Sequence, residues 1–174
     1  MYPDCDEILK MAPDYDIIPV CREIYADVIT PITLLRKLAA VSKRYYLLES
    51  VEGGEKWGRY SFLGFDPVMR VKCSCGKVTI EKDGEETEKV TDKPLEVLRE
   101  ILKDYKAPRL AGLPPFAGGF VGYFAYAMIG YAEPKLKIKK GTFNDYDMML
   151  FDKVIAYDHL KQKISIIVNM KTDK

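Results

Sequence analysis

Short stretches in which apolar and polar residues alternate follow one another along most of the chain. Such alternation places apolar side chains on one face of an extended segment and predicts half-buried strands. The segments with this pattern, or with a short apolar run, are residues 20–29, 45–49, 60–64, 68–74, 77–81, 118–126, 148–157 and 163–168. Cys75-Gly76 predicts a hairpin turn between two of them, and a connector containing His159 joins the last two.

Two segments instead show the three- and four-residue spacing of apolar side chains that is typical of helices. In the first, Thr30 is the expected N-cap and Pro31 the first helical residue. The apolar positions of this helix are Ile32, Leu34, Leu35, Leu38, Ala39 and Val41. In the second, which covers residues 94–105, Asp92 or Thr91 is the expected cap.

The segments outside these elements are polar or charged. Residues 1–16 contain prolines and acidic side chains and predict a loose lead-in. Residues 81–93 are mostly charged, with Asp83-Gly84 as a turn signal, and predict a solvated loop. Residues 128–131 predict a short turn or helix.

The order of these elements indicates the fold class. Predicted strands outnumber helices by roughly three to one, and most connectors are short. This favours an α+β fold, with a largely antiparallel sheet or sheets and helices packed on them. The 174 residues suggest one domain over residues 17–174.

Composition and charge argue against several classes of protein. The net charge of +1 lacks the basic surplus of a general nucleic-acid binder. No apolar run reaches the roughly 18 residues that suggest a membrane span. The N-terminus carries Asp4, Asp6 and Glu7 rather than the apolar stretch of a secretory signal. We therefore expect a cytoplasmic protein without nucleic-acid or membrane partners.

The four cysteines and the single histidine form no recognisable site in the sequence. Cys73 and Cys75 are separated by one residue, and Cys5 and Cys21 lack the spacing of zinc ligands. Reduced cysteines without a metal are expected in such a chain. His159 has no nucleophile signature around it, so the sequence predicts no catalytic residue.

The ends of the second and third predicted strands carry the most informative polar groups. The first of these strands ends at Glu49 and Ser50, and the return strand begins with Arg59, Tyr60 and Ser61. Polar groups at adjacent strand ends can converge on a small ligand, and a free amino acid is one candidate. Its ammonium prefers a carboxylate, its carboxylate prefers N–H, O–H or cationic donors, and its side chain prefers an apolar wall.

Each of these residues also has a structural interpretation. Glu49 and Ser50 could simply meet water at a strand end. Arg59 could hold a carboxylate, stack on a ring, or fix the turn through an ion pair with one of three glutamates, Glu49, Glu52 or Glu55. The two residues that follow Arg59 could pack in the core rather than contact a ligand.

Three glycines in one predicted strand, Gly118, Gly119 and Gly122, predict close packing. They lack the spacing of a dinucleotide-binding loop, and they lie within or before a strand instead of opening a helix. Glycine allows another backbone or a bulky ring to approach.

Three segments resemble the N-terminal region of anthranilate synthase component I, in the order of that family. They are Leu47-Leu48-Glu49-Ser50 with Gly58-Arg59-Tyr60-Ser61-Phe62-Leu63-Gly64, then residues 115–126, then residues 147–158. The later segments are also similar to component I of aminodeoxychorismate synthase. The Leu48-Glu49-Ser50 triplet resembles the anthranilate enzyme more.

The resemblance implies a tryptophan feedback site in this region, lined by the triplet. The predicted tryptophan-binding residues are Leu48, Glu49, Ser50, Arg59, Tyr60 and Ser61. It also implies that the whole enzyme converts chorismate and ammonia into anthranilate and pyruvate. Chorismate and Mg²⁺ would be bound by a C-terminal half, and ammonia would come from a glutamine amidotransferase subunit, component II.

The motifs of that C-terminal half are not found in the chain. It contains no segment similar to Gly-Asp-Ile-Phe-Gln and no corresponding catalytic His and Glu set. We therefore expect the catalytic half to be absent and these residues alone to be inactive. The alternative is an N-terminal structural domain of aminodeoxychorismate synthase in the folate pathway, in which a bound indole would be a fixed core element.

Overall fold

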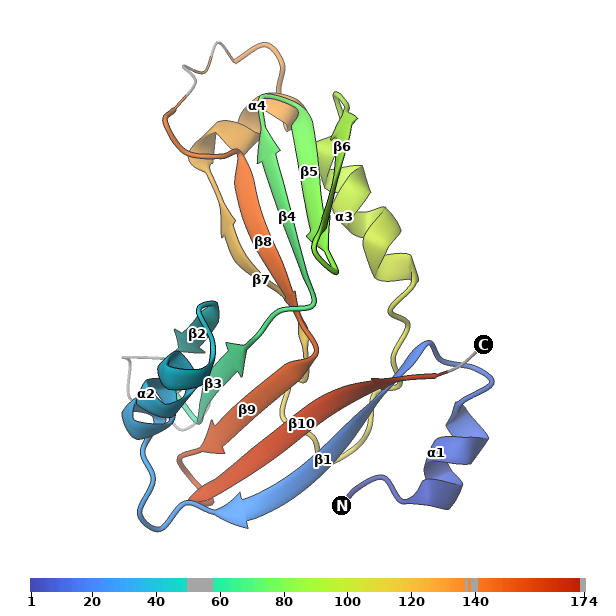
Figure 1. Ribbon diagram of the computed structural model, residues 1–174, viewed down its shortest axis with the longest axis vertical. Helices are drawn as coiled ribbons and strands as arrows, with labels where there is room; N and C mark the ends of the chain where they lie inside the picture. The colour runs from blue at the N-terminus through green and yellow to red at the C-terminus, as the bar shows by residue number, and fades with distance from the viewer. Residues whose placement is uncertain (50–57, 137, 139–140, 173–174) are drawn as a thin grey trace. The chain divides into compact units, whose positions relative to one another are not determined.

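A computed structural model describes residues 1–49, 58–136, 138 and 141–172 (Figure 1). The chain folds as two compact units, which we call the first and the second unit. The first consists of Met1–Pro67, Tyr105–Gly119 and Phe151–Lys174, and the second of Val68–Asp104 and Phe120–Leu150. The length predicts one domain, but the strands form two separate sheets.

The first unit is built on a five-stranded sheet with the order β1-β10-β9-β3-β2, counted over the described residues. Its strands, which pair antiparallel, are β1 (Ile17–Tyr25), β2 (Tyr45–Leu48), β3 (Tyr60–Phe65), β9 (Lys153–Asp158) and β10 (Lys163–Lys171). Helix α2 (Pro31–Val41) begins at the predicted N-cap, because Thr30 Oγ1 accepts a hydrogen bond from the backbone N–H of Thr33 at 3.2 Å. Leu34 of this helix packs on a core that contains Tyr157 and Ile164.

The second unit has its own five-stranded sheet, with the order β6-β5-β4-β8-β7 among the residues described. Its strands are β4 (Met69–Ser74), β5 (Lys77–Lys82), β6 (Glu85–Val90), β7 (Gly119–Phe124) and β8 (Tyr146–Phe151). Its helices are α3 (Pro94–Lys103), the 3₁₀ helix η1 (Tyr126–Met128) and α4 (Ile129–Ala132). Val71, Val78 and Tyr146 are fully buried, and Tyr146 donates a hydrogen bond to the carbonyl oxygen of Pro94 at 3.1 Å.

The predicted hairpin at Cys75-Gly76 is confirmed. The two residues have φ angles of 52° and 79°, and they join the antiparallel strands β4 and β5. Together with the two sheets and the packed helices, this confirms the predicted α+β class.

The prediction of a solvated loop over residues 81–93 is wrong in its centre. Asp83 and Gly84 do form a turn, with φ angles of 54° and 83°, but the chain then returns as the edge strand β6. All six residues of β6 are exposed. Charged side chains are common on edge strands because they discourage pairing with other chains, so the composition resembled that of a loop.

The predicted single strand over residues 148–157 is two strands. The chain bends at Asp152, so β8 belongs to the sheet of the second unit and β9 to that of the first. Apolar residues resume after only two charged ones, Asp152 and Lys153, because both strands are buried in their own sheets. Periodicity alone does not mark such a change of sheet.

Two features of the helices differ from the sequence predictions: residues 1–16 contain a helix, and α3 has a different N-cap. Residues 1–16 contain helix α1 (Cys5–Met11), which Asp4 and Glu7 close with a capping box, rather than only a loose lead-in. Helix α3 has Lys93 at its N-cap without a side-chain cap, so neither Asp92 nor Thr91 takes that position.

The predicted close packing around two of the glycines is confirmed. A Cβ atom on Gly122 would lie 2.8 Å from Met148 Cα and still closer to the carbonyl oxygen of Asp147. Gly118 has a φ of 152°, and a Cβ there would meet Phe151 O at 3.1 Å and Asn169 Nδ2 at less than that. Strand β7 therefore approaches β8 at a distance that only glycine permits.

Candidate functional site

Five of the six predicted ligand residues lie at the ends of β2 and β3 in the first unit. Leu48 is the last residue of β2 and is paired with Phe62, while Glu49 follows it and is exposed. Arg59 directly precedes β3, and Tyr60 and Ser61 open that strand. Ser50 lies outside the described residues.

Glu49 and Ser61 contact each other through their side chains. Ser61 is fully buried, and its hydroxyl donates a hydrogen bond to Glu49 Oε1 at 3.1 Å. The same hydroxyl lies 2.7 Å from Nε2 of His159, in the turn after β9. An acid, an alcohol and an imidazole thus form one connected polar group at the edge of the sheet.

His159 is held in this position by contacts on several sides. Its backbone N–H donates to the carbonyl oxygen of Arg59 at 2.8 Å. Its ring packs against the buried ring of Tyr157, with centroids 4.7 Å apart. Its own carbonyl oxygen accepts a hydrogen bond from Gln162 Nε2 at 2.7 Å. These contacts fix the imidazole relative to β3.

Arg59 forms an ion pair, but with a partner that the sequence did not indicate. Its Nε donates to both carboxylate oxygens of Asp158, at 3.1 and 3.2 Å, and its Nη2 donates to Oδ2 at 2.7 Å. The expected partners were Glu49, Glu52 and Glu55, of which the last two lie outside the described residues. The pairing arises because Tyr60 and Asp158 are opposite each other in the β3–β9 ladder.

Tyr60 takes part in packing at the same strand end. The Arg59 guanidinium carbon lies 4.8 Å from the centroid of the Tyr60 ring, and this ring stacks on Phe62 with centroids 5.7 Å apart. Both the stacking of Arg59 on an aromatic ring and the packing of Tyr60 are interpretations that the sequence left open.

Asp158 and His159 are the residues of this network that sequence reasoning missed. Both were placed in a connector, and 98 residues separate His159 from Ser61. The sequence did contain one signal. An aspartate at the start of a turn commonly accepts hydrogen bonds from backbone N–H groups just after it, as Asp158 does from Leu160 and Lys161, both at 3.0 Å.

Protonation of Asp158 is expected to destabilise the protein at acid pH. Burial raises the pKa of this carboxyl group, but hydrogen bonds from Arg59 and from the backbone of Lys161 and Leu160 outweigh burial, so its pKa lies below the ordinary value. A lowered pKa stabilises the folded state above the unfolded-state pKa of about 4, and this contribution is lost as the pH falls through the folded-state value.

Thermal unfolding of the full-length protein and of its Asp158→Asn variant as a function of pH checks this expectation. At neutral pH the variant should unfold at a lower temperature, because the charged hydrogen bonds with Arg59 are weakened. The difference between the two proteins should shrink as the pH falls below about 4. A difference that stays constant down to the acid limit would contradict the assignment.

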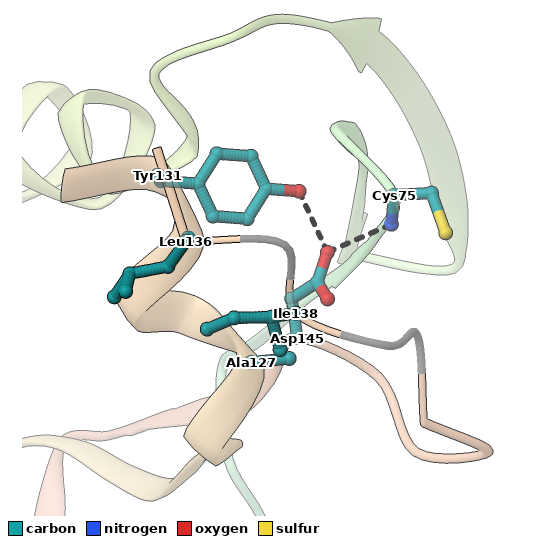
Figure 2. A pocket seen from close by; sticks show the side chains of 7 residues that line it. Cys75, Ala127, Tyr131, Leu136, Ile138 and Asp145 are labelled. Atoms are coloured by element: carbon teal, nitrogen blue, oxygen red, sulfur yellow. Dashed lines mark hydrogen bonds between the residues drawn. The ribbon is translucent and has the colours of Figure 1, made fainter. Parts of the chain in front are cut away.

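A cavity of about 240 Å³ lies in the second unit and is lined mainly by Cys75, Tyr131, Leu136, Ile138 and Asp145 (Figure 2). Asp145 Oδ2 accepts hydrogen bonds from the hydroxyl of Tyr131 and from the backbone N–H of Cys75, both at 2.7 Å. The carboxylate therefore ties the β4–β5 turn to α4, which is a structural role.

A buried thiol borders the same carboxylate but is not reactive. Cys73 is fully buried, and burial raises the pKa of its thiol to about 11. The thiol thus stays protonated at neutral pH, whereas nucleophilic attack and metal binding need the thiolate. All four cysteines are free.

Among residues 1–49, 58–136, 138 and 141–172, no three His, Cys, Asp or Glu side chains gather into a group that could hold a metal ion. In the same residues, no helix has both the length and the apolar character that a membrane crossing requires.

Comparisons with known proteins connect this fold to one family of enzymes. No family model matches the chain. The chain is 45% identical over 172 residues to anthranilate synthase component 1 of Acetivibrio thermocellus, which covers 97% of this chain and 34% of that protein. It is 40% identical over 169 residues to the protein of the same name from Pseudomonas aeruginosa, covering 94% of this chain and 34% of that protein.

A solved structure agrees with these relatives. The crystal structure of anthranilate synthase component I from Streptococcus pneumoniae matches with a TM-score of 0.53 and 27% identity, over 86% of this chain and 32% of that one. These similarities place the two-sheet α+β chain among the N-terminal regions of larger enzymes. The chain is homologous over nearly its whole length to anthranilate synthase component I proteins, and it spans about a third (34%) of the length of the relatives it matches.

Proposed function

We propose that this chain is the N-terminal regulatory domain of an anthranilate synthase component I and contributes to its tryptophan feedback site. The observation that carries the proposal is the position of Glu49 in a chain of this family. Its carboxylate is exposed at the end of β2 and is oriented by the buried hydroxyl of Ser61. An exposed but oriented carboxylate is suited to bind the ammonium of a free amino acid.

The neighbouring groups complement the rest of a tryptophan molecule. Leu48 is 47% exposed and offers apolar surface to an indole ring. Arg59 is already bound by Asp158, so it is a weaker candidate for the ligand carboxylate than the sequence suggested. We assign that role to the hydroxyl or backbone N–H of Ser50, which the sequence predicts to help hold the ligand.

The activity and partners of the whole protein follow as part of this proposal. The full-length enzyme would convert chorismate and ammonia into anthranilate and pyruvate in tryptophan biosynthesis, in the cytoplasm. A glutamine amidotransferase, component II, would supply the ammonia. Tryptophan would inhibit by binding more tightly to a conformation in which the catalytic half is not productive.

Catalysis belongs to the remainder of the protein in this proposal. The described residues offer no cluster of ligands for Mg²⁺, so no catalytic step is assigned to this chain. Chorismate and Mg²⁺ would bind in the C-terminal half, and these residues alone would have no synthase activity.

The alternative, a structural domain of aminodeoxychorismate synthase, predicts that bound tryptophan does not exchange freely with the solution. The relatives reported above are named anthranilate synthases, which favours the regulatory function. Calorimetric titration of the full-length protein with tryptophan, together with a rate assay, tests the choice. Tryptophan that exchanges freely and inhibits supports regulation, whereas tryptophan that survives dialysis and leaves the rate unchanged supports the structural role.

A bulky residue at position 50 is expected to block the proposed site. In the full-length protein, Ser50→Phe should abolish most inhibition by tryptophan, because the ring would occupy the space of the ligand. Ser74→Phe, at an exposed serine of the second unit, is the matched control and should retain inhibition. Normal inhibition of Ser50→Phe would remove Ser50 from the site.

A further inference from the structure

We propose that Ser61 and His159 position the Glu49 carboxylate before tryptophan binds. The hydrogen-bonded chain from His159 through Ser61 to Glu49, which we call the relay, sets the affinity of the site. The inference rests on the proposed function, because it concerns the same ligand. It gives Ser61 a positioning role and adds a second positioning residue, His159, which comes from the turn after β9 rather than from the segment around residue 50.

The direction of the hydrogen bonds follows from the chemistry of the three groups. An ionised carboxylate only accepts hydrogen bonds, so the single proton of the Ser61 hydroxyl points to Glu49 Oε1. The oxygen of Ser61 is then left as an acceptor for His159 Nε2 at 2.7 Å. The imidazole therefore carries a proton on Nε2, and the relay runs from His159 through Ser61 to Glu49.

The relay is anchored at its inner end. Ser61 is paired with Tyr157 of β9, and it has no exposed surface. The His159 ring rests on Tyr157, and its backbone is tied to Arg59. The turn that carries His159 is further closed by Asp158, whose carboxylate accepts from the backbone N–H of the two residues after His159.

Holding the Glu49 side chain in one position before the ligand arrives lowers the entropy cost of binding tryptophan. A free glutamate side chain at a strand end samples many rotamers, and ordering it on binding weakens affinity. A hydrogen bond from Ser61 holds one oxygen in place, while a carboxylate can accept further hydrogen bonds from a ligand ammonium. Removal of the His159 donor to Ser61 should therefore weaken tryptophan binding even though His159 itself need not contact tryptophan.

Matched variants of His159 in the full-length protein test this inference. His159→Phe keeps a ring against Tyr157 but has no donor for Ser61, and it should raise the dissociation constant of tryptophan by about 2- to 12-fold. His159→Gln retains an N–H donor at a similar distance from the backbone, and it should bind within about twofold of the wild type. Calorimetric titration with tryptophan gives the constants.

Combination with Glu49→Ala separates positioning from a general effect on the fold. Without the carboxylate there is nothing for the relay to orient, so adding His159→Phe to Glu49→Ala should cause no further loss of affinity. Equal affinities of wild type and His159→Phe, equal losses in the Phe and Gln variants, or fully additive losses in the double variant would overturn the inference alone. A wild-type protein that does not bind tryptophan would overturn the proposed function and this inference together.

Discussion

Replacing Glu49 by alanine in the full-length protein is expected to raise the inhibition constant of tryptophan by about 10- to 150-fold. The range corresponds to the loss of one charge-assisted hydrogen bond, worth roughly 1.5–3 kcal/mol. The effect should be near the upper limit if the ammonium of tryptophan has no other carboxylate partner. Steady-state inhibition of the synthase reaction, measured at several chorismate concentrations, gives the constant.

Two further variants show whether the charge of Glu49 is responsible. Glu49→Gln keeps an oxygen that can accept the hydrogen bond of Ser61 but has no charge, so its inhibition should be weakened almost as much as that of Glu49→Ala. Glu85→Ala removes an exposed glutamate at the start of β6 in the second unit, and it should leave the inhibition constant unchanged. Unchanged inhibition of Glu49→Ala would show that Glu49 does not bind the ligand.

The parts of the fold that could be predicted are those with a local cause. Thr30 and Pro31 mark the start of α2 because a cap and a fixed φ act within one helical turn. Cys75 and Gly76 mark a hairpin because the turn itself requires their positive φ angles. In both cases the signal and the structure it causes lie within a few residues of each other.

The parts that could not be predicted depend on pairing between distant segments. Strand β6 has no apolar face, and it exists because its backbone pairs with β5. The change of sheet at Asp152 interrupts the hydrophobic pattern by only two charged residues, since the strands on both sides are buried. Such features follow from which strands are neighbours, and the pattern along one strand does not contain that information.

The candidate site divides in the same way. Glu49 and Ser61 could be placed together from the sequence, because β2 and β3 are consecutive strands. The register that brings Asp158 to Arg59 and His159 to Ser61 is set by the pairing of β3 with β9, nearly a hundred residues apart. A histidine that appeared isolated in the sequence is therefore part of the polar network.

Gly122 of β7 lies where the neighbouring strand β8 approaches closely, so a larger residue there should destabilise the protein strongly. Gly122→Ala should destabilise the full-length protein by about 3 kcal/mol or more, at the upper end of the cost of overpacking. The added Cβ would meet backbone atoms of Asp147 and Met148 in the neighbouring strand, which cannot rotate away as a side chain could. Strand β7 would have to separate from β8.

Gly130→Ala is the matched control for this prediction. Gly130 lies in α4, and a Cβ there would have no other atom within 4 Å. Because alanine favours a helix more than glycine does, this variant should be neutral or slightly more stable. Calorimetric unfolding of both variants and the wild type measures the difference. If Gly122→Ala unfolds at the same temperature as Gly130→Ala, then β7 and β8 do not pack at the distance that excludes a Cβ, and glycine at position 122 has another cause.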